Sequence, residues 1–241
     1  MTINDYRLSL WNFFWYYTEG SLEDLMDEVR AAGYGIEIWD RWKEDRGLYQ
    51  PKYHARLAAM TAGMKVSLHG RSCKGRDDHL AQFETAKAIR ADVVVVHLQQ
   101  FPAGDGRFDL PLMKEMAQRC RDAGMTMALE NGRLEGLASA FDFCGDALGW
   151  CFDTGHFEGL ERALPTFIGA FGRRLCHIHL QDPEPKDDHW ELGTGILPAD
   201  DWRMLKAHLA KIDYRGAAVF EVRPRRPGPT ADRCVRFFEG V

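Results

Sequence analysis

Short apolar runs alternate along the chain with longer stretches in which apolar residues recur at helical spacing, and this pattern occurs eight times. The predicted strands are Arg7–Trp11, Gly35–Trp39, Lys65–His69, Asp92–His97, Thr126–Asn131, Gly149–Asp153, Arg174–Gln181 and Ala217–Arg223. The predicted helices are Ser21–Ala32, Lys52–Ala62, Asp77–Arg90, Leu110–Ala123, Leu134–Cys144, Leu160–Phe171, Asp200–Lys211 and Thr230–Glu239. Ser21 and Asp24 have the spacing of a capping box with aspartate in place of glutamate.

Eight strand–helix units in 241 residues fit the size of a (β/α)₈ TIM barrel, which usually takes about 250. An open doubly wound sheet would usually carry a glycine-rich phosphate loop after its first strand. Neither G-x-G-x-x-G nor G-x-x-x-x-G-K-[ST] occurs in the chain. The sequence therefore predicts that residues 1–241 form a single α/β domain, a closed TIM barrel with its site at the carboxyl ends of the strands.

Side chains alternate along a strand, so each strand residue can be assigned to the barrel interior or to the helix layer. In Thr126–Asn131, the bulky Met127 and Leu129 are expected to face the helices, which leaves Glu130 inside. The same counting places Cys176 and Ile178 outside. It assigns several polar residues to the inner face, namely Glu37, His69, Asp153, His177, His179, Glu221 and Arg223.

The third to eighth predicted strands each end on or near a histidine or an acidic residue: His69, His97, Glu130, Asp153, His179 and Glu221. Catalytic residues of a TIM barrel gather at the carboxyl ends of its strands, so these side chains are expected to meet at the mouth. The last four form a mixed oxygen and nitrogen donor set, which suits one divalent ion such as Mn²⁺, Mg²⁺, Co²⁺ or Zn²⁺. We therefore predict metal ligation by Glu130, Asp153, His179 and Glu221.

The order of these motifs resembles the sugar phosphate isomerase/epimerase superfamily of xylose isomerase-like TIM barrels. This superfamily includes ketose 3-epimerases and hydroxypyruvate isomerase and is related to endonuclease IV. The resemblance spans the third to eighth strands and rests on Val-Ser-Leu-His69-Gly, Val-Val-Val-His97, Ala-Leu-Glu130-Asn131, Phe-Asp153-Thr-Gly-His156, His177-Ile-His179-Leu-Gln-Asp182, His189-x₃-Gly193-Thr-Gly195 and Phe-Glu221-Val-Arg223. It implies that Glu130 and Glu221 are also the proton-transfer pair, and that His156 and Arg223 hold substrate oxygens.

The expected function is a divalent-metal-dependent isomerase or epimerase of a keto-sugar or sugar phosphate. A proton next to a ketose carbonyl becomes removable at neutral pH when a divalent ion stabilises the cis-enediolate and a carboxylate accepts the proton. Two glutamates on different sides of the metal can address opposite faces of that planar intermediate, which gives epimerisation. Return of the proton to the adjacent carbon gives isomerisation instead, and the ligand set does not distinguish the two.

Further residues are candidates for substrate contacts. His69 and His97 can hold substrate hydroxyls or a further metal, or can be hydrogen-bonded histidines of the mouth. Glu37 can bind a sugar hydroxyl, act as a second base partner, or pair with a Lys or Arg at the mouth. Asp187 and His189 are expected on a loop that folds back over the site, and His177 as a buried partner. Trp11, Phe13, Phe14 and Trp15 can form an aromatic wall against the sugar or simply pack in the core. Phosphate contacts are open to several basic residues, which can equally be solvated loop charges: Arg71, Lys74, Arg76, Arg223, Arg225 and Arg226.

Composition limits the partners. The formal net charge of −5 gives no reason to expect nucleic acid, because binding to nucleic acid depends on phosphate neutralisation. The six cysteines show no C-x-x-C spacing and are interpreted as reduced. No apolar run is long enough to span a bilayer, and the N-terminus lacks a signal-like segment, so a soluble cytoplasmic protein with no membrane contact is expected. Assembly into a homo-oligomer is left open.

Three other functions remain alternatives. The first is an endonuclease IV-like trinuclear zinc phosphodiesterase, because nine residues match that set in order: His69, His97, Glu130, Asp153, His156, His179, Asp187, His189 and Glu221. The net charge, the apparently short loops and the lack of a basic stripe weigh against it. The second is a metal-dependent lyase that dehydrates a keto-sugar or inosose. The third is a non-catalytic subunit that keeps only the barrel.

Overall fold

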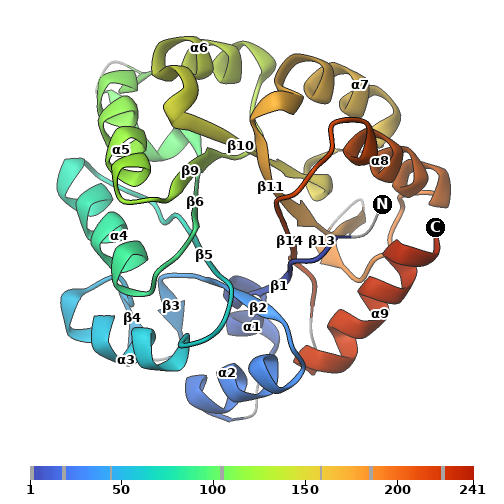
Figure 1. Ribbon diagram of the computed structural model, residues 1–241, viewed down its shortest axis with the longest axis horizontal. Coiled ribbons are helices and arrows are strands. Elements are labelled where there is room, and N and C mark those ends of the chain that lie inside the picture. Colours follow the sequence, from blue (N-terminus) through green and yellow to red (C-terminus); the bar gives the residue numbers. More distant parts are fainter. Residues whose placement is uncertain are drawn as a thin grey trace.

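The computed structural model describes residues 3–17, 20–43, 45–103, 106–157, 159–184, 187–223 and 226–241. A ring of parallel strands forms the centre of the molecule and closes on itself (Figure 1). In ring order from β1, the strands are β1 (Tyr6–Ser9), β14 (Ala217–Phe220), β11 (Leu175–Leu180), β10 (Leu148–Asp153), β9 (Thr126–Leu129), β6 (Val93–Val96), β5 (Val66–His69) and β2 (Gly35–Ile38). The predicted (β/α)₈ barrel is confirmed.

Helices surround the strand ring (Figure 1). They are α2 (Leu22–Ala31), α3 (His54–Met60), α4 (Arg76–Ala88), α5 (Leu110–Asp122), α6 (Leu134–Cys144), α7 (Leu160–Phe171), α8 (Ala199–Lys211) and α9 (Pro227–Gly240). The predicted capping box opens α2, because Ser21 Oγ accepts from the Asp24 amide at 3.1 Å and the Asp24 carboxylate accepts from the Ser21 amide at 2.8 Å. Among the described residues, every helix is too short or too polar to cross a bilayer.

The first predicted strand is too long, because Leu10–Tyr16 forms a further helix, α1. Leu10, Phe13 and Tyr17 recur at helical spacing and are all buried, so this aromatic segment packs as a helix and not as a strand extension. Trp11 therefore lies on a helix. Phe13 is fully buried in the core, so for this residue the packing alternative holds.

Additional small elements lie in the loops, and the sequence pattern did not predict them. Three antiparallel hairpins follow the carboxyl ends of barrel strands: β3 (Arg41–Trp42) with β4 (Asp45–Arg46), β7 (Pro102–Ala103) with β8 (Arg107–Phe108), and β12 (Asp182–Glu184) with β13 (Asp187–Trp190). Short 3₁₀ turns complete the connections: η1 (Pro51–Tyr53), η2 (Leu98–Gln100), η3 (Gly145–Ala147), η4 (Thr154–His156) and η5 (Gly172–Arg174). The hairpins thus belong to the face where a TIM barrel carries its site.

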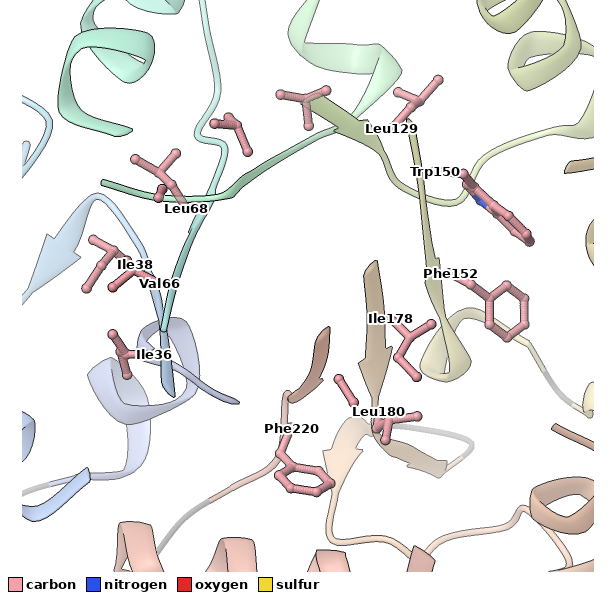
Figure 2. Close-up of a cluster of buried hydrophobic side chains, with 14 of the residues drawn as sticks. Ile36, Ile38, Val66, Leu68, Leu129, Trp150, Phe152, Ile178, Leu180 and Phe220 are labelled. Atoms are coloured by element: carbon pink, nitrogen blue, oxygen red, sulfur yellow. The ribbon is translucent and has the colours of Figure 1, made fainter. Parts of the chain in front are cut away.

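The main hydrophobic core fills the layer between strands and helices. Its strand residues lie around the outside of the ring, among them Ile36, Ile38, Leu68, Leu129, Trp150, Phe152, Ile178 and Phe220 (Figure 2). A separate small cluster of Val93, Val95, Ala128 and Cys151 fills the inside. These positions follow the predicted alternation of the strands.

Cys176 is an exception to that alternation, because it packs against the inner cluster instead of facing outward as predicted. The pairing of β10 with β11 shifts register here, so that Trp150 pairs with Leu175 but Cys151 pairs with His177. This bulge leaves Cys176 as the extra residue. Gly149 makes room for it, since a Cβ at that position would lie 2.6 Å from the Cys176 Sγ.

The amino-terminal end of the barrel is closed by a buried charge. Arg7 is only 1% exposed, and its guanidinium contacts Asp5 at 2.8 Å and Asp92 at 2.5 Å. Gly35 on the neighbouring strand gives the Arg7 stem its space, since a Cβ there would lie 2.8 Å from the Arg7 Cγ. Two carboxylates compensate the buried cation, so this end of the barrel is sealed by a structural ion-pair network.

Candidate metal centre

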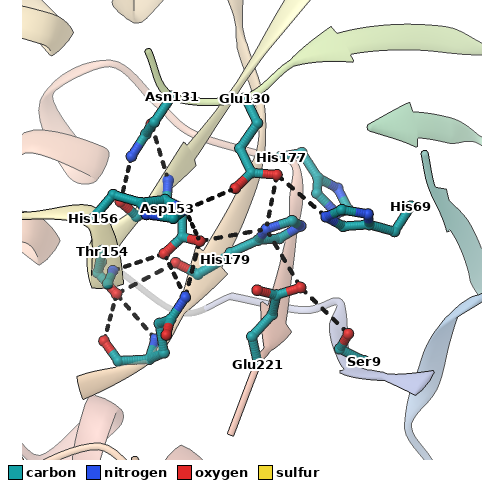
Figure 3. A network of polar contacts seen from close by, with 12 residues as sticks. Ser9, His69, Glu130, Asn131, Asp153, Thr154, His156, His177, His179 and Glu221 are labelled. Atoms are coloured by element: carbon teal, nitrogen blue, oxygen red, sulfur yellow. Dashed lines mark hydrogen bonds and ion pairs between the residues drawn. The ribbon is translucent and has the colours of Figure 1, made fainter. Parts of the chain in front are cut away.

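Four buried side chains meet at the carboxyl ends of consecutive strands in the ring (Figure 3). Glu130 follows β9, Asp153 ends β10, His179 lies on β11 and Glu221 follows β14. The Nδ1 atom of His179 lies 3.6 Å from Glu130 Oε2, 3.9 Å from Asp153 Oδ2 and 3.7 Å from Glu221 Oε1. The three carboxylates predicted as metal ligands therefore surround one nitrogen of the fourth predicted ligand, His179.

These side chains have the properties expected of a cation site. His179 Nδ1 and Glu130 Oε2 are buried and have no hydrogen-bond partner among the described residues. Buried polar atoms are rarely left unpaired. Ligand atoms that share one ion at about 2.1 Å lie about 3 to 4 Å from one another, which is the range of the three contacts with His179. The chemistry of these donors thus suits a hard divalent ion. Among the described residues, the groups whose ligand atoms all lie within 4.8 Å of one another combine part of the four with neighbouring side chains: Glu130, Asp153 and His156; His69, His97 and Glu130; Glu130, Cys151 and His179; and Glu37, His69, His179 and Glu221.

The Glu130 carboxylate also faces three further imidazoles. Its Oε2 lies 3.4 Å from His69 Nε2 and 3.3 Å from His97 Nε2, and its Oε1 lies 3.4 Å from His156 Nε2. His189, on β13, approaches the other glutamate, with its Nε2 3.7 Å from Glu221 Oε2. The mouth therefore holds more potential nitrogen ligands than a single ion requires.

Asp153 is held by residues whose roles the sequence did not predict. The side chain of Asn131 donates to the Asp153 carbonyl at 2.6 Å and accepts from its amide at 3.2 Å. Gln181 Nε2 lies 3.0 and 2.9 Å from the two carboxylate oxygens, and the Gly155 amide donates to Oδ1 at 2.7 Å. Position 155 needs glycine, since a Cβ there would lie 2.2 Å from Gln181. Asn131 and Gln181 close two of the predicted strands and stand in motifs that carry the resemblance, but the sequence assigned them no role.

Glu37 lies deeper in the barrel than expected. It pairs in register with Ser67 within the ring and is fully buried, and its carboxylate lies within 4.8 Å of ligand atoms of His69, His179 and Glu221. His177 Nε2 lies 2.8 Å from Glu37 Oε2, so a histidine and not a Lys or Arg partners this carboxylate, and contact with a sugar hydroxyl stays a prediction. His177 is itself fully buried.

The rim of the mouth carries aromatic rings. The ring of Trp11 lies 4.4 Å from that of His189, with 31° between their planes. Trp39 and Trp15 continue this aromatic group from Trp11, and Trp15 is 55% exposed. The Arg223 guanidinium lies 4.9 Å from the centre of the Trp190 ring. Trp11 thus reaches the mouth from helix α1.

The basic residues considered for phosphate binding are partly engaged elsewhere. Arg71 forms ion pairs with Asp40 at 2.9 Å and Asp78 at 3.0 Å, and Arg76 pairs with Glu115 at 2.6 Å. Lys74 and Arg226 are exposed. Arg225 and the side chain of Asp187 lie outside the described part of the structure.

Crowding of charges shifts the ionisation of the metal-free site. Burial raises the pKa of Asp153 to about 6, and the charge of Asp153 raises the pKa of His156 to about 10. Burial alone would lower the pKa of His69, but its contact with Glu130 outweighs this effect and raises the pKa to about 9. Burial would raise the pKa of Glu221, but the neighbouring His179 lowers it. At neutral pH, imidazolium ions therefore balance the carboxylates.

We expect metal affinity to fall as the pH drops through the neutral range, and more steeply below about 6. His179 must be neutral to ligate; burial would lower its pKa, but the neighbouring Cys151 and Glu221 raise it well above its usual value, so a proton competes with the ion there at neutral pH. A proton on Asp153 adds to this competition in the mildly acidic range, because burial raises its pKa to about 6 and only the carboxylate form ligates. Protonation of Asp153 should lower the metal affinity by a further factor of about ten for each pH unit below the pKa of this residue. Titration calorimetry with Mn²⁺ between pH 5 and pH 8 measures it. An affinity that stays constant between pH 5 and pH 7 would contradict the expectation.

Solved structures share this fold over nearly the whole chain. A D-tagatose 3-epimerase-like protein is 18% identical, with a TM-score of 0.69 over 98% of this chain and 97% of that one. The protein TTHB071 of Thermus thermophilus, in a crystal soaked with ZnCl₂, is 23% identical, with a TM-score of 0.68 over 98% of both chains. Endonuclease IV of the same organism is 21% identical, with a TM-score of 0.63 over 98% of both chains.

Sequence comparison gives the family. The uncharacterized protein y4fM of Sinorhizobium fredii is 32% identical over 83 residues, which make up 33% of this chain. The match spans only 25% of that relative's length. A sequence model of the family described as xylose isomerase-like TIM barrel matches residues 26–239, which is most of the chain and includes all four residues around His179 Nδ1. The chain therefore belongs to the xylose isomerase-like TIM barrel family.

Proposed function

We propose that residues 1–241 form a divalent-metal-dependent isomerase or epimerase that acts on a keto-sugar or sugar phosphate. The observation that carries this proposal is the placement of two glutamates around one imidazole. Glu130 and Glu221 follow strands separated in the ring by β10 and β11, and their carboxylates lie 3.6 and 3.7 Å from His179 Nδ1. They approach a common centre from two sides, as a reaction with proton transfer on both faces of a substrate requires.

Glu130, Asp153, His179 and Glu221 would hold the divalent ion. When bound, this ion would act as a Lewis acid that makes the C–H bond beside a substrate carbonyl more acidic. The zinc-soaked structure of TTHB071 supports Zn²⁺ as one candidate beside Mn²⁺, Mg²⁺ and Co²⁺. Nδ1 is the ligand atom of His179, since its Nε2 points down the barrel to Glu37 at 3.1 Å.

The protein's own residues would carry the proton. Glu221 has a lowered pKa and is ionised at neutral pH, so it can accept a proton from a substrate carbon. Glu130, on the other side of His179, would pass a proton to the opposite face. Burial would raise its pKa, but the neighbouring His97 and His179 hold it well below its usual range, so this proton would come from the imidazolium of His156, whose Nε2 lies 3.4 Å from Glu130 Oε1. The two glutamates exchange roles in the reverse reaction. His156 and Arg223 would hold substrate oxygens, and Trp11 beside His189 would pack against the apolar face of a sugar.

Deuterium incorporation into a sugar panel tests this function directly. The purified protein is incubated in D₂O with Mn²⁺ and a set of ketoses and ketose phosphates, and proton NMR follows the loss of C–H signals beside the carbonyl. We expect exchange in one substrate class, together with a new epimer or aldose. A product that has lost water would identify a lyase instead. A metal-loaded protein that exchanges no proton in any member of the panel would contradict the proposal.

A second candidate function is hydrolysis of a phosphodiester in abasic DNA, with three metal ions. The supporting observation is that Glu130 faces the imidazoles of His69, His97 and His156 within 3.3 to 3.4 Å, which offers ligands for additional ions. Metal analysis separates the two, because about one ion per chain supports the isomerase and about three support the phosphodiesterase. Cleavage of an abasic duplex at physiological salt would replace the first proposal with the second.

A further inference from the structure

A buried polar cluster lies beneath the candidate metal centre and consists of Glu37, Ser67 and His177. All three side chains are fully buried. Ser67 Oγ donates to Glu37 Oε2 at 2.9 Å, and His177 Nε2 lies 2.8 Å from the same oxygen. Removing a carboxylate from water costs free energy, so its complete burial with these partners indicates a specific role.

The ring of His179 joins this cluster to the mouth. Its Nδ1 faces the carboxylates of Glu130, Asp153 and Glu221, whereas its Nε2 lies 3.1 Å from Glu37 Oε1. Neither His179 Nε2 nor Glu37 Oε1 has a hydrogen bond to any other described residue. The 3.1 Å ion-pair contact between these two atoms is therefore not shared with a hydrogen bond to any other described residue.

The chemistry of a carboxylate fixes the direction of these contacts. An ionised carboxylate only accepts hydrogen bonds, so the imidazole nitrogens that face Glu37 must carry hydrogen. With the proton on Nε2, the lone pair of a neutral His179 lies on Nδ1, toward the mouth. We propose that Glu37 is a positioning residue that holds the His179 ring and its tautomer so that Nδ1 can ligate the divalent ion. This inference rests on the proposed function only in that it concerns the same metal centre.

The other members of the cluster hold Glu37 itself. His177 contacts Oε2 and holds the carboxylate with Oε1 toward His179, while Ser67 adds a further hydrogen bond to the oxygen that His177 already occupies. A carboxylate behind a metal-bound histidine orients the ring and increases its basicity, and loss of such a partner typically weakens metal binding 10- to 100-fold. Glu37 would thus act on the ion through His179, with no contact to the substrate.

Three variants test this role. Glu37→Ala removes the acceptor, Glu37→Gln keeps the shape and one acceptor oxygen but loses the charge, and Ser67→Ala is the matched control because it removes a bond only to Oε2. Zn²⁺ affinity is measured by competition with a chromophoric chelator. We expect about 100-fold weaker binding in Glu37→Ala, about tenfold weaker binding in Glu37→Gln, and binding close to wild type in Ser67→Ala. If Glu37→Ala does not fold, Glu37→Gln decides alone.

A second readout does not depend on the metal. NMR of ¹⁵N-histidine-labelled, metal-free protein observes the proton on His179 Nε2 directly. In the wild type, this proton should resonate downfield and exchange slowly with solvent. The signal should persist in Ser67→Ala, disappear in Glu37→Ala and shift in Glu37→Gln. Wild-type protein that binds no Zn²⁺ would contradict the proposed function, and this signal would then decide the role of Glu37. Zn²⁺ affinities of both Glu37 variants equal to that of the wild type, or an unchanged Nε2–H signal, would overturn the inference.

Discussion

Replacing Glu221 with glutamine should lower the interconversion of substrate and product by about 10²- to 10⁴-fold, the usual contribution of a positioned acid or base. The amide has the shape of the carboxylate and can still offer an oxygen to a metal ion, but it cannot accept a proton from carbon. Glu221 is 5% exposed and has a lowered pKa, so the wild-type group is ionised and largely shielded from water. Glu130→Gln should cause a loss of similar size.

The two variants should differ in which substrate proton they still exchange with solvent. Because Glu130 and Glu221 lie on two sides of His179, each variant keeps the carboxylate that faces one substrate face. Glu221→Gln should therefore lose deuterium exchange with one epimer and Glu130→Gln with the other. Proton NMR in D₂O at saturating Mn²⁺ measures both rates.

An exposed glutamate provides the control for these measurements. Glu135 lies on the exposed surface of α6, so Glu135→Gln should leave both exchange rates unchanged. Metal content should be measured in every variant, because a lost ion would also stop the reaction. If Glu221→Gln or Glu130→Gln contains metal and interconverts substrate at the wild-type rate, that residue is not part of the proton-transfer pair.

Features that depend on local pattern could be predicted from the sequence. The eightfold alternation predicted the barrel, because each strand and helix carries its own period. The capping box of Ser21 and Asp24 involves residues three apart. Strand parity likewise placed Glu130 and Asp153 on the inner face, because alternation needs no knowledge of neighbouring strands.

Features that depend on pairing between distant strands could not be predicted. The alternation of side chains along the strand assigned Glu37 to the correct face of the sheet. Its position along the barrel axis follows from its pairing with Ser67 on the neighbouring strand, and the alternation within one strand does not specify this pairing. Cys176 faces inward because of a bulge in the pairing of β10 with β11. The support of Asp153 by Gln181 also crosses strands, from the end of β11 to the end of β10.

Removing divalent metal with a chelator should abolish turnover while the barrel stays folded. The carboxylates around His179 would not be left as unbalanced negative charge, because His69 and His156 have pKa values of about 9 and 10 and carry protons at pH 7. The main hydrophobic core lies outside the strand ring and does not include these residues. Far-ultraviolet circular dichroism should therefore change little on chelation, and added Mn²⁺ should restore turnover.

Chelation should also lower the melting temperature. An ion present at 100 times its dissociation constant stabilises the folded state by about 2.7 kcal/mol, which for a chain of this length corresponds to about 5 to 10 °C. Differential scanning calorimetry with and without a chelator measures the shift in melting temperature. His179→Ala is the control, because this variant lacks the central nitrogen ligand and should melt at nearly the same temperature in both conditions. Equal melting temperatures for wild-type protein with and without saturating metal would contradict ligation by these four residues, since an ion bound only to the folded state must stabilise it.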